Sequence, residues 1–252
     1  MNYRKNKGSF IKYLICVCMI FIINLGELLS YNMIDMPITE ILLYTFFDGT
    51  YQKEKMNLVQ TITNIMPLWM WVLLFSNHIV DGNDLDNIYM FTRYQSRKAW
   101  YKDKIKKILF ESVFFTLIHS FLYGIIATGA SKSIWSINDI KFLLCITVIV
   151  WLYCWIHVFI ANCIRMLAVE ERVNVYVILL FVIELFGCSL IELAKNKIIG
   201  IVNPTFFLTN FYKLQVEEIG AGVIYLLFLA GMVVQIGNLL IKQIDIGIRR
   251  KR

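Results

Sequence analysis

The sequence predicts an all-α, polytopic membrane protein with six transmembrane helices and cytoplasmic N- and C-termini. Of its 252 residues, 58% are apolar and only 17% are charged, and the mean hydropathy is +0.63. A soluble domain is normally about 45–50% apolar and about 25% charged. The apolar residues also gather in runs of roughly 20, the length that crosses a hydrocarbon core of about 30 Å. Lipid is therefore the expected solvent of this chain.

Six segments have the length and apolar character of a membrane span. In chain order they are Tyr13–Tyr31, Leu58–Val80, Ile108–Ala130, Ile140–Ile164, Val175–Ala194 and Ala221–Ile241. The first follows a basic stretch, as in a signal peptide, but its apolar run exceeds the usual length of about 7–15 residues and no small-residue cleavage site follows. We expect it to remain as a helix. No linker or low-complexity tract divides the chain, so residues 1–252 are expected to form one transmembrane domain.

Lysine and arginine are distributed unevenly between the two sides of the predicted spans. With six spans, both termini share a side with the loops 81–107 and 165–174, and that side carries 18 of the 25 basic residues. An excess of this kind marks the cytoplasmic side of a membrane protein. The net charge of +7 is therefore mainly a topology signal. Because the basic residues are scattered over four pieces beside membrane helices, no nucleic-acid partner is expected.

Several residues inside the spans are disruptive or costly in hydrocarbon. Pro67 interrupts the second span, where proline removes a backbone hydrogen bond and usually kinks the helix. The ionisable side chains at membrane depth are Glu27, Glu111, His119, His157, Glu184 and Glu192. Such groups mark functional sites by default. For the deepest two, Glu184 and His119, two roles stay open: lining a pathway or subunit seam, or a paired, structural role. Pro67 either only kinks its helix or belongs to a gate or pathway.

Two predicted external pieces are apolar but too short to cross the membrane. Residues 38–47 are expected to lie in the membrane interface. The second piece starts at Pro204, which follows an asparagine, and Asn-Pro is a favourable helix start with Asn as the cap. Phe207, Phe211 and Leu214 then recur at i, i+4 and i+7 along one helical face. This pattern predicts a short helix that is either re-entrant or lies on the membrane surface.

The loop between the second and third spans holds the densest cluster of basic and aromatic residues. If it is helical from about Phe91, then Arg93, Arg97, Trp100 and Lys104 form one water-facing stripe. Tryptophan and arginine are enriched at binding hot spots, so we expect this loop to dock a protein partner. The candidate docking residues are Arg93, Tyr94, Ser96, Arg97, Trp100, Tyr101 and Lys104. The alternative is contact with anionic lipid, which would repel the acidic residues just before the cluster.

Together these features resemble the permease subunit of a type-2 ABC exporter. The run Arg93-x-x-Ser96-Arg97-x-x-Trp100-Tyr101-x-x-Lys104 is similar to the corresponding loop of small permeases found beside bacteriocin or lantibiotic gene clusters. The resemblance implies that the loop is a coupling helix that docks on a separate ATP-binding subunit. It also implies a second permease copy or a paralogue as partner, an antimicrobial peptide as cargo, and the cell membrane of a Gram-positive bacterium as location.

The sequence itself contains no nucleotide-binding or hydrolase motif. It has no Gly-x-x-x-x-Gly-Lys-Ser/Thr phosphate loop, so ATP and Mg²⁺ are expected in the partner subunit and no cofactor or metal in this chain. His-Glu-x-x-His and Gly-x-Ser-x-Gly are also missing, so no enzymatic activity is expected. The predicted function is export of an amphipathic or hydrophobic compound. The alternative is a stand-alone membrane immunity protein that sequesters a peptide without ATP.

Overall fold

The computed structural model describes residues 2–30, 36–47, 58–76, 96–167, 172–194, 202–210 and 216–243. Within these ranges the helices of the chain are α1 (Asn2–Ser30), α2 (Ile38–Phe47), α3 (Leu58–Phe75), α5 (Arg97–Ala130), α6 (Ile137–Leu167), α7 (Val173–Ala194), α9 (Pro204–Asn210) and α10 (Val216–Gln243). No strand occurs in the described ranges. The predicted all-α class is confirmed.

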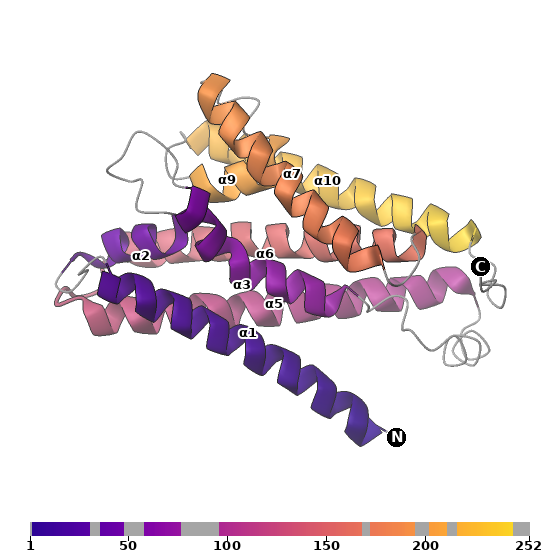
Figure 1. Cartoon of the computed structure of the whole chain (residues 1–252), viewed down its shortest axis with the longest axis horizontal. Coiled ribbons are helices and arrows are strands. Elements are labelled where there is room, and N and C mark those ends of the chain that lie inside the picture. The colour runs from indigo at the N-terminus through magenta and orange to yellow at the C-terminus, as the bar shows by residue number, and fades with distance from the viewer. Residues whose placement is uncertain are drawn as a thin grey trace.

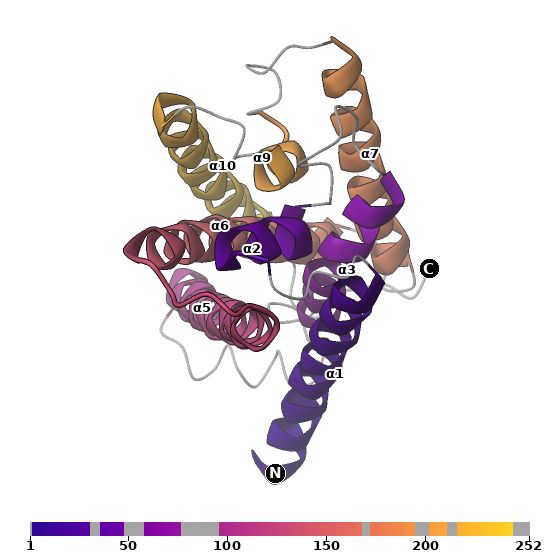
Figure 2. The same cartoon turned by 90° about the vertical axis from the view of Figure 1, so that its left-hand side faces the viewer.

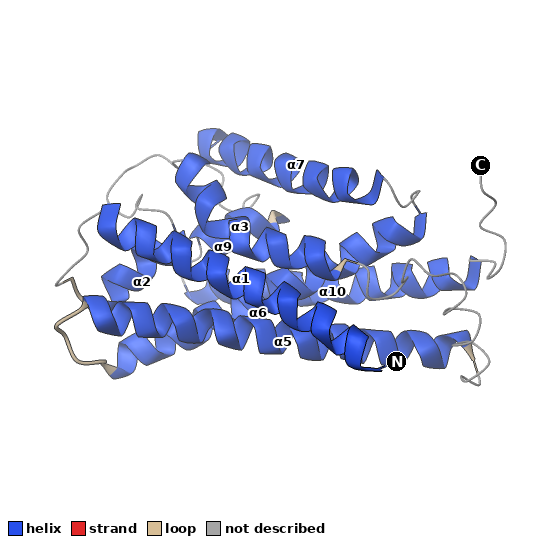
Figure 3. Cartoon of the chain, turned by 60° about the horizontal axis from the view of Figure 1, so that its bottom comes forward, coloured by secondary structure: helices blue, strands red, loops and turns tan. Residues whose placement is uncertain are grey.

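The longer helices extend between the two ends of the molecule, each opposite in direction to the one before it, and α1 and α7 are inclined to the others (Figure 1). These longer helices are α1, α3, α5, α6, α7 and α10. The starts of α1 and α5 and the end of α10 therefore lie at one end of the bundle. The turn between α5 and α6 lies at the other end, beside α2, and a second view shows the same arrangement (Figure 3).

Four helices in the described part are long and apolar enough to cross a membrane. The qualifying stretches are Lys98–Ala130, Ile137–Leu167, Val173–Ile191 and Glu217–Lys242. The first two predicted spans appear as shorter apolar stretches, Ile11–Gly26 in α1 and Thr61–Phe75 in α3. The second predicted span continues to residue 80, but residues 77–95 lie outside the described ranges. Four such helices fit a multi-pass membrane protein.

Helix α6 forms the centre of the bundle. It contacts α2, α3, α5, α7, α9 and α10. In the view along the bundle, α5 lies below α6, and α9 and α10 lie above it (Figure 2). In the apolar stretch of α6 that is long enough to cross a membrane, 56% of the residues are buried, compared with 22% in the corresponding stretch of α10. Ile140, Leu144 and Val148 lie on the exposed face of α6, and most of the remaining helix packs against these neighbours. Polar residues on α6 are therefore placed to meet partners from several other helices.

Helix α5 joins the basic loop to the third predicted span without a break. Ser96 caps it, since the Ser96 Oγ accepts a hydrogen bond from the Ala99 N–H at 3.2 Å. With 34 residues at 1.5 Å each, α5 is about 51 Å long, roughly 20 Å more than a hydrocarbon core. The apolar part begins at Ile108, so the excess length carries the basic residues. The loop is helical from Arg97, whereas residues 91–95 lie outside the described ranges.

Helix α2 lies against the bundle rather than apart from it. Ile38, Ile41 and Leu42 are buried, and the helix contacts α3, α5, α6 and α9. The hydroxyl of Thr39 donates a hydrogen bond to Asp139 Oδ1 in the first turn of α6. The apolar side chains that predicted an interfacial helix thus serve to anchor α2 at this end of the bundle.

Helix α9 begins at Pro204, as the Asn-Pro pair predicts. Asn203 Oδ1 accepts hydrogen bonds from the N–H groups of Thr205 and Phe206 at 3.0 and 3.1 Å. Both Pro204 and Phe207 are buried, and α9 lies between α7 and α10 (Figure 2). The short helix thus packs into the bundle, and whether it is re-entrant or lies at the membrane surface stays a prediction. Two members of the predicted stripe, Phe211 and Leu214, lie outside the described residues.

Candidate functional site

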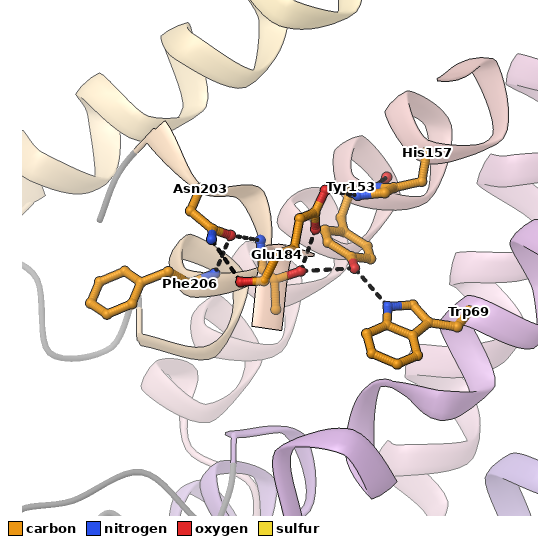
Figure 4. A network of polar contacts seen from close by, with 7 residues as sticks. Trp69, Tyr153, His157, Glu184, Asn203 and Phe206 are labelled. Carbon is orange, nitrogen blue, oxygen red and sulfur yellow. Dashed lines mark hydrogen bonds and ion pairs between the residues drawn. The ribbon is translucent and has the colours of Figure 1, made fainter. Parts of the chain in front are cut away.

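A group of polar side chains lies buried where α3, α6, α7 and α9 meet, with Glu184 of α7 at its centre (Figure 4). Glu184 Oε1 is 2.8 Å from His157 Nε2 on α6, and Glu184 Oε2 accepts a hydrogen bond from the Thr205 hydroxyl on α9 at 2.6 Å. The Glu184 side chain is only 11% exposed. Both carboxyl oxygens are thus engaged, as burial of a polar group requires. Glu184 is therefore paired with side chains of two other helices, and a role in a pathway or subunit seam stays a prediction.

Tyr153 extends this group to α3. The Tyr153 hydroxyl lies 3.1 Å from the Thr205 hydroxyl and accepts a hydrogen bond from Trp69 Nε1 at 2.9 Å. The Trp69 ring also stacks on Phe181 of α7, with ring centroids 4.5 Å apart. Pro67 lies inside α3, two residues before Trp69, and the α3 ribbon bends along its length (Figure 1). The predicted kink therefore lies beside the polar group.

Asn203 fixes the start of α9 against α7. Its Oδ1 caps α9, and its Nδ2 donates a hydrogen bond to the backbone carbonyl oxygen of Glu184 at 2.8 Å. Gly187 makes this approach possible, because a Cβ at position 187 would meet Asn203 Nδ2 at 2.7 Å. One asparagine side chain thus satisfies backbone groups on two helices.

The hydrogen bonds around His157 and Glu184 determine the total number of protons on the pair, and so its net charge. His157 Nδ1 is 2.7 Å from the backbone carbonyl oxygen of Tyr153, which only accepts hydrogen bonds, so Nδ1 carries a hydrogen. The contact between His157 Nε2 and Glu184 Oε1 needs one more proton, on either the imidazole or the carboxyl group. In both cases the pair has no net charge, the least costly state for ionisable groups at membrane depth.

Sequence reasoning singled out Glu184 but not the residues that hold it. His157 was recognised as an ionisable group at membrane depth, yet nothing in the spacing pairs it with residue 184, which belongs to another span. Tyr153 and Thr205 carry no sequence signal of a polar site. Only the packing of α6, α7 and α9 brings these side chains to Glu184. In the described ranges no three histidine, cysteine, aspartate or glutamate side chains could hold a metal ion.

His119 belongs to a different environment. It lies on α5 and is buried, with its ring centroid 4.6 Å from that of Tyr123 and 5.9 Å from that of Phe115. The side-chain partners of Glu184 are on α6 and α9 instead. The structure therefore does not bring together the two deepest ionisable residues.

The expectation of a water-facing Trp100 is wrong. Trp100 and Tyr101 are 3% and 2% exposed, because both rings turn toward the bundle. The Tyr101 hydroxyl donates a hydrogen bond to the backbone carbonyl oxygen of Val234 on α10 at 3.0 Å. Lys104 lies with its Nζ 5.6 Å from the centroid of the Trp100 ring. Burial of a large aromatic ring lowers the free energy of the folded chain, so these two rings pack into the bundle instead of facing water.

Other side chains form the water-facing surface of the first turns of α5. Lys98, Lys102 and Lys106 are exposed and recur at i, i+4 and i+8, so they share one face of the helix. Ser96, the helix cap, is exposed as well. Arg93, Tyr94 and the side chain of Arg97 lie outside the described residues. Among the described side chains, the exposed face of the first turns of α5 is thus formed by lysines, whereas Trp100 and Tyr101 lie on the buried face.

The chain matches no protein-family model, and neither a curated protein nor a solved structure shows significant similarity to it.

Proposed function

We propose that this chain is the permease subunit of an ATP-driven, type-2 ABC exporter. It would move an amphipathic or hydrophobic compound, with an antimicrobial peptide as the cargo implied by the resemblance, out of the cell or the membrane. The observation that carries the proposal is the continuity of α5, which joins an exposed basic segment to a membrane-length apolar segment in one helix. A force applied to the basic end therefore reaches the membrane interior without crossing a flexible joint.

The proposal includes six spans, cytoplasmic termini and a location in the cell membrane of a Gram-positive bacterium. In support, α1 and α3 extend between the two ends of the bundle, although α1 is inclined to α5 and α6 and α3 is bent (Figure 1). They accompany the four helices that are long and apolar enough to cross a membrane. The alternation of direction places the start of α1, the start of α5 and the end of α10 at one end. The excess of basic residues on that side supports its assignment as the cytoplasmic end.

The docking surface of the proposed coupling segment is its basic face, formed by Lys98, Lys102 and Lys106. Trp100 and Tyr101 have a different task, since both are buried and Tyr101 is bonded to α10. Movement of the basic face by a nucleotide-bound partner would therefore carry α5 and α10 together. ATP and Mg²⁺ would remain in that partner, and a second permease copy or a paralogue would complete the transporter.

Hydrogen bonds between α5 and α6 offer a route from the basic face to the polar group. Trp151 Nε1 donates to the Ser112 hydroxyl at 3.1 Å, and the Thr147 hydroxyl donates to the Ser120 hydroxyl at 2.8 Å. Farther along α6, His157 is paired with Glu184 of α7. A displacement of α5 relative to α6 would thus change the position of α7 and α9 through these side-chain contacts.

Affinity purification of the full chain from its own host in mild detergent tests the proposal. The wild-type chain should co-purify in stoichiometric amount with an ATPase that carries a phosphate loop. The double variant Lys98→Glu with Lys102→Glu should lose that ATPase. As a control of equal charge change, Lys132→Glu with Lys141→Glu at the opposite end of the bundle should retain it.

Two outcomes would contradict the proposal. One is an ATPase that stays bound to the Lys98→Glu, Lys102→Glu variant. The other is protection against a peptide in cells that contain the chain but lack any such ATPase, which would instead indicate a stand-alone immunity protein.

A further inference from the structure

A groove of about 920 Å³ follows the outer side of α5 and α6. Its lining is almost wholly apolar and includes Phe114, Phe121 and Leu144. The residues on α5 extend from Phe114 to Gly129, which covers about 22 Å at 1.5 Å per residue. One leaflet contributes about half of a hydrocarbon core of about 30 Å. The groove is therefore longer than the acyl part of one leaflet.

The few polar groups in the groove are already satisfied within the chain. The Thr147 hydroxyl donates to the Ser120 hydroxyl at 2.8 Å, and the Thr128 hydroxyl donates to the Gly124 carbonyl oxygen at 2.7 Å. Thr128 also accepts a hydrogen bond from Trp135 Nε1 at 2.9 Å, which holds the indole at one end of the groove. A polar occupant would find no unsatisfied partner here, so the interior of the groove suits a hydrocarbon chain.

Two glycines of α5, Gly124 and Gly129, line the groove and have no side chain to fill it. A Cβ at Gly129 would meet nothing within 4 Å. A Cβ at Gly124 would meet Leu143 at 3.7 Å and Trp135 at 3.9 Å, so the absent side chain keeps the groove open beside the indole. The hollow therefore depends on which residues occupy these two positions of α5.

Two lysines stand at the end of the groove that Trp135 marks. Lys132 lies in the chain between the lining residues Gly129 and Trp135, and its side chain is exposed. Lys141 is also exposed and precedes the lining residue Leu144 by three positions on α6, so both share one helical face. An apolar channel with positive charge at its end matches an amphipathic molecule with an anionic head.

We propose that this groove binds one anionic phospholipid, with an acyl chain along Phe114, Phe121 and Leu144 and its phosphate near Lys132 and Lys141. The charge at one end distinguishes this site from a purely apolar lipid-facing surface. The site is independent of the proposed ATP-driven export, because the docking lysines lie near the start of α5, whereas Lys132 follows its end and Lys141 lies near the start of α6.

Native mass spectrometry of the full chain, released from nanodiscs of equal parts phosphatidylcholine and phosphatidylglycerol, tests the site. The wild-type chain should retain one phosphatidylglycerol in preference to phosphatidylcholine. Gly129→Leu should lower this retention about fourfold or more, the factor that one buried methylene group contributes. Gly231→Leu on α10 is the matched control, because a Cβ there also meets nothing within 4 Å, and it should leave retention unchanged.

A second pair of variants tests the head-group end. Lys132→Glu with Lys141→Glu should abolish the preference for phosphatidylglycerol, whereas Lys98→Glu with Lys102→Glu should keep it. Equal retention by wild type and Gly129→Leu would overturn the proposal. So would a change from dimer to monomer in Gly129→Leu without loss of lipid, which would show that a second copy covers the groove. Loss of the ATPase in the docking variants has no bearing on these outcomes.

Discussion

The phenol ring of Tyr101 on α5 lies directly against the backbone of Gly237 on α10. The Tyr101 hydroxyl donates a hydrogen bond to the Val234 carbonyl oxygen, one turn before Gly237. A Cβ at position 237 would collide with the Tyr101 side chain, so only glycine allows this approach. The contact joins the basic end of α5 to the last helix of the bundle.

Replacing Gly237 with alanine should therefore destabilise the protein by about 1–3 kcal/mol, the usual cost of overpacking. Thermal unfolding in detergent measures the effect. Gly231→Ala is the control, because open space surrounds that position and alanine favours a helix over glycine by about 1 kcal/mol. If both variants unfolded at the same temperature, Tyr101 would not be packed against Gly237.

The polar group around Glu184 should respond to the loss of hydrogen bonds more than to the loss of charge. Glu184→Ala leaves His157 Nε2 and the Thr205 hydroxyl without their partner, at a cost of about 1–3 kcal/mol. Glu184→Gln keeps the size of the side chain, and its amide can donate to His157 and accept from Thr205. A smaller loss of unfolding free energy is thus expected for glutamine than for alanine. Equal losses would show that the carboxyl group has to be charged.

Asp139 should hold two structures at once, the start of α6 and the attachment of α2. Asp139 Oδ2 accepts hydrogen bonds from the N–H and hydroxyl of Ser136 at 2.7 and 2.6 Å, and Oδ1 accepts from Thr39. Asp139→Ala should accelerate backbone hydrogen exchange in both α2 and the first turn of α6. Thr39→Val should accelerate it in α2 alone. Faster exchange in neither helix would contradict the anchoring of α2 by this carboxylate.

The two ends of α5 should face opposite sides of the membrane. Lys98 is exposed near its start, and Ile134 is 93% exposed in the turn that follows it. In intact cells, a membrane-impermeant maleimide should label Ile134→Cys, whereas Lys98→Cys should react only after the cells are opened. The wild-type chain reports the background from its own six cysteines. The reverse pattern would place the termini outside the cell.

Local signals in the sequence were sufficient to place several elements. The start of α9 follows from Asn203 and Pro204, because capping and a fixed backbone angle act within a few residues. The spans from α5 onward follow from apolar runs of membrane length, since lipid imposes that length on each helix separately. Local chemistry also identified Glu184 as unusual, because a carboxyl group at that depth needs a partner wherever the partner lies.

The remaining features depend on packing between distant segments. The chain brings Trp69, Tyr153, Glu184 and Thr205 together from four helices, and no spacing within one helix encodes such a meeting. The burial of Tyr101 depends in the same way on α10, more than a hundred residues later. An aromatic residue beside lysines fits either an exposed anchor or an inward contact, and the neighbouring helix decides between them.

The shared proton of His157 and Glu184 has a consequence for the electrical behaviour of the protein. Work done by the transmembrane voltage on a moving group is proportional to its net charge, about 2.3 kcal/mol per charge per 100 mV. A pair of zero net charge that moves as a unit with α6 and α7 experiences almost no such work. Rearrangement around this pair should therefore proceed equally in polarised and depolarised membranes.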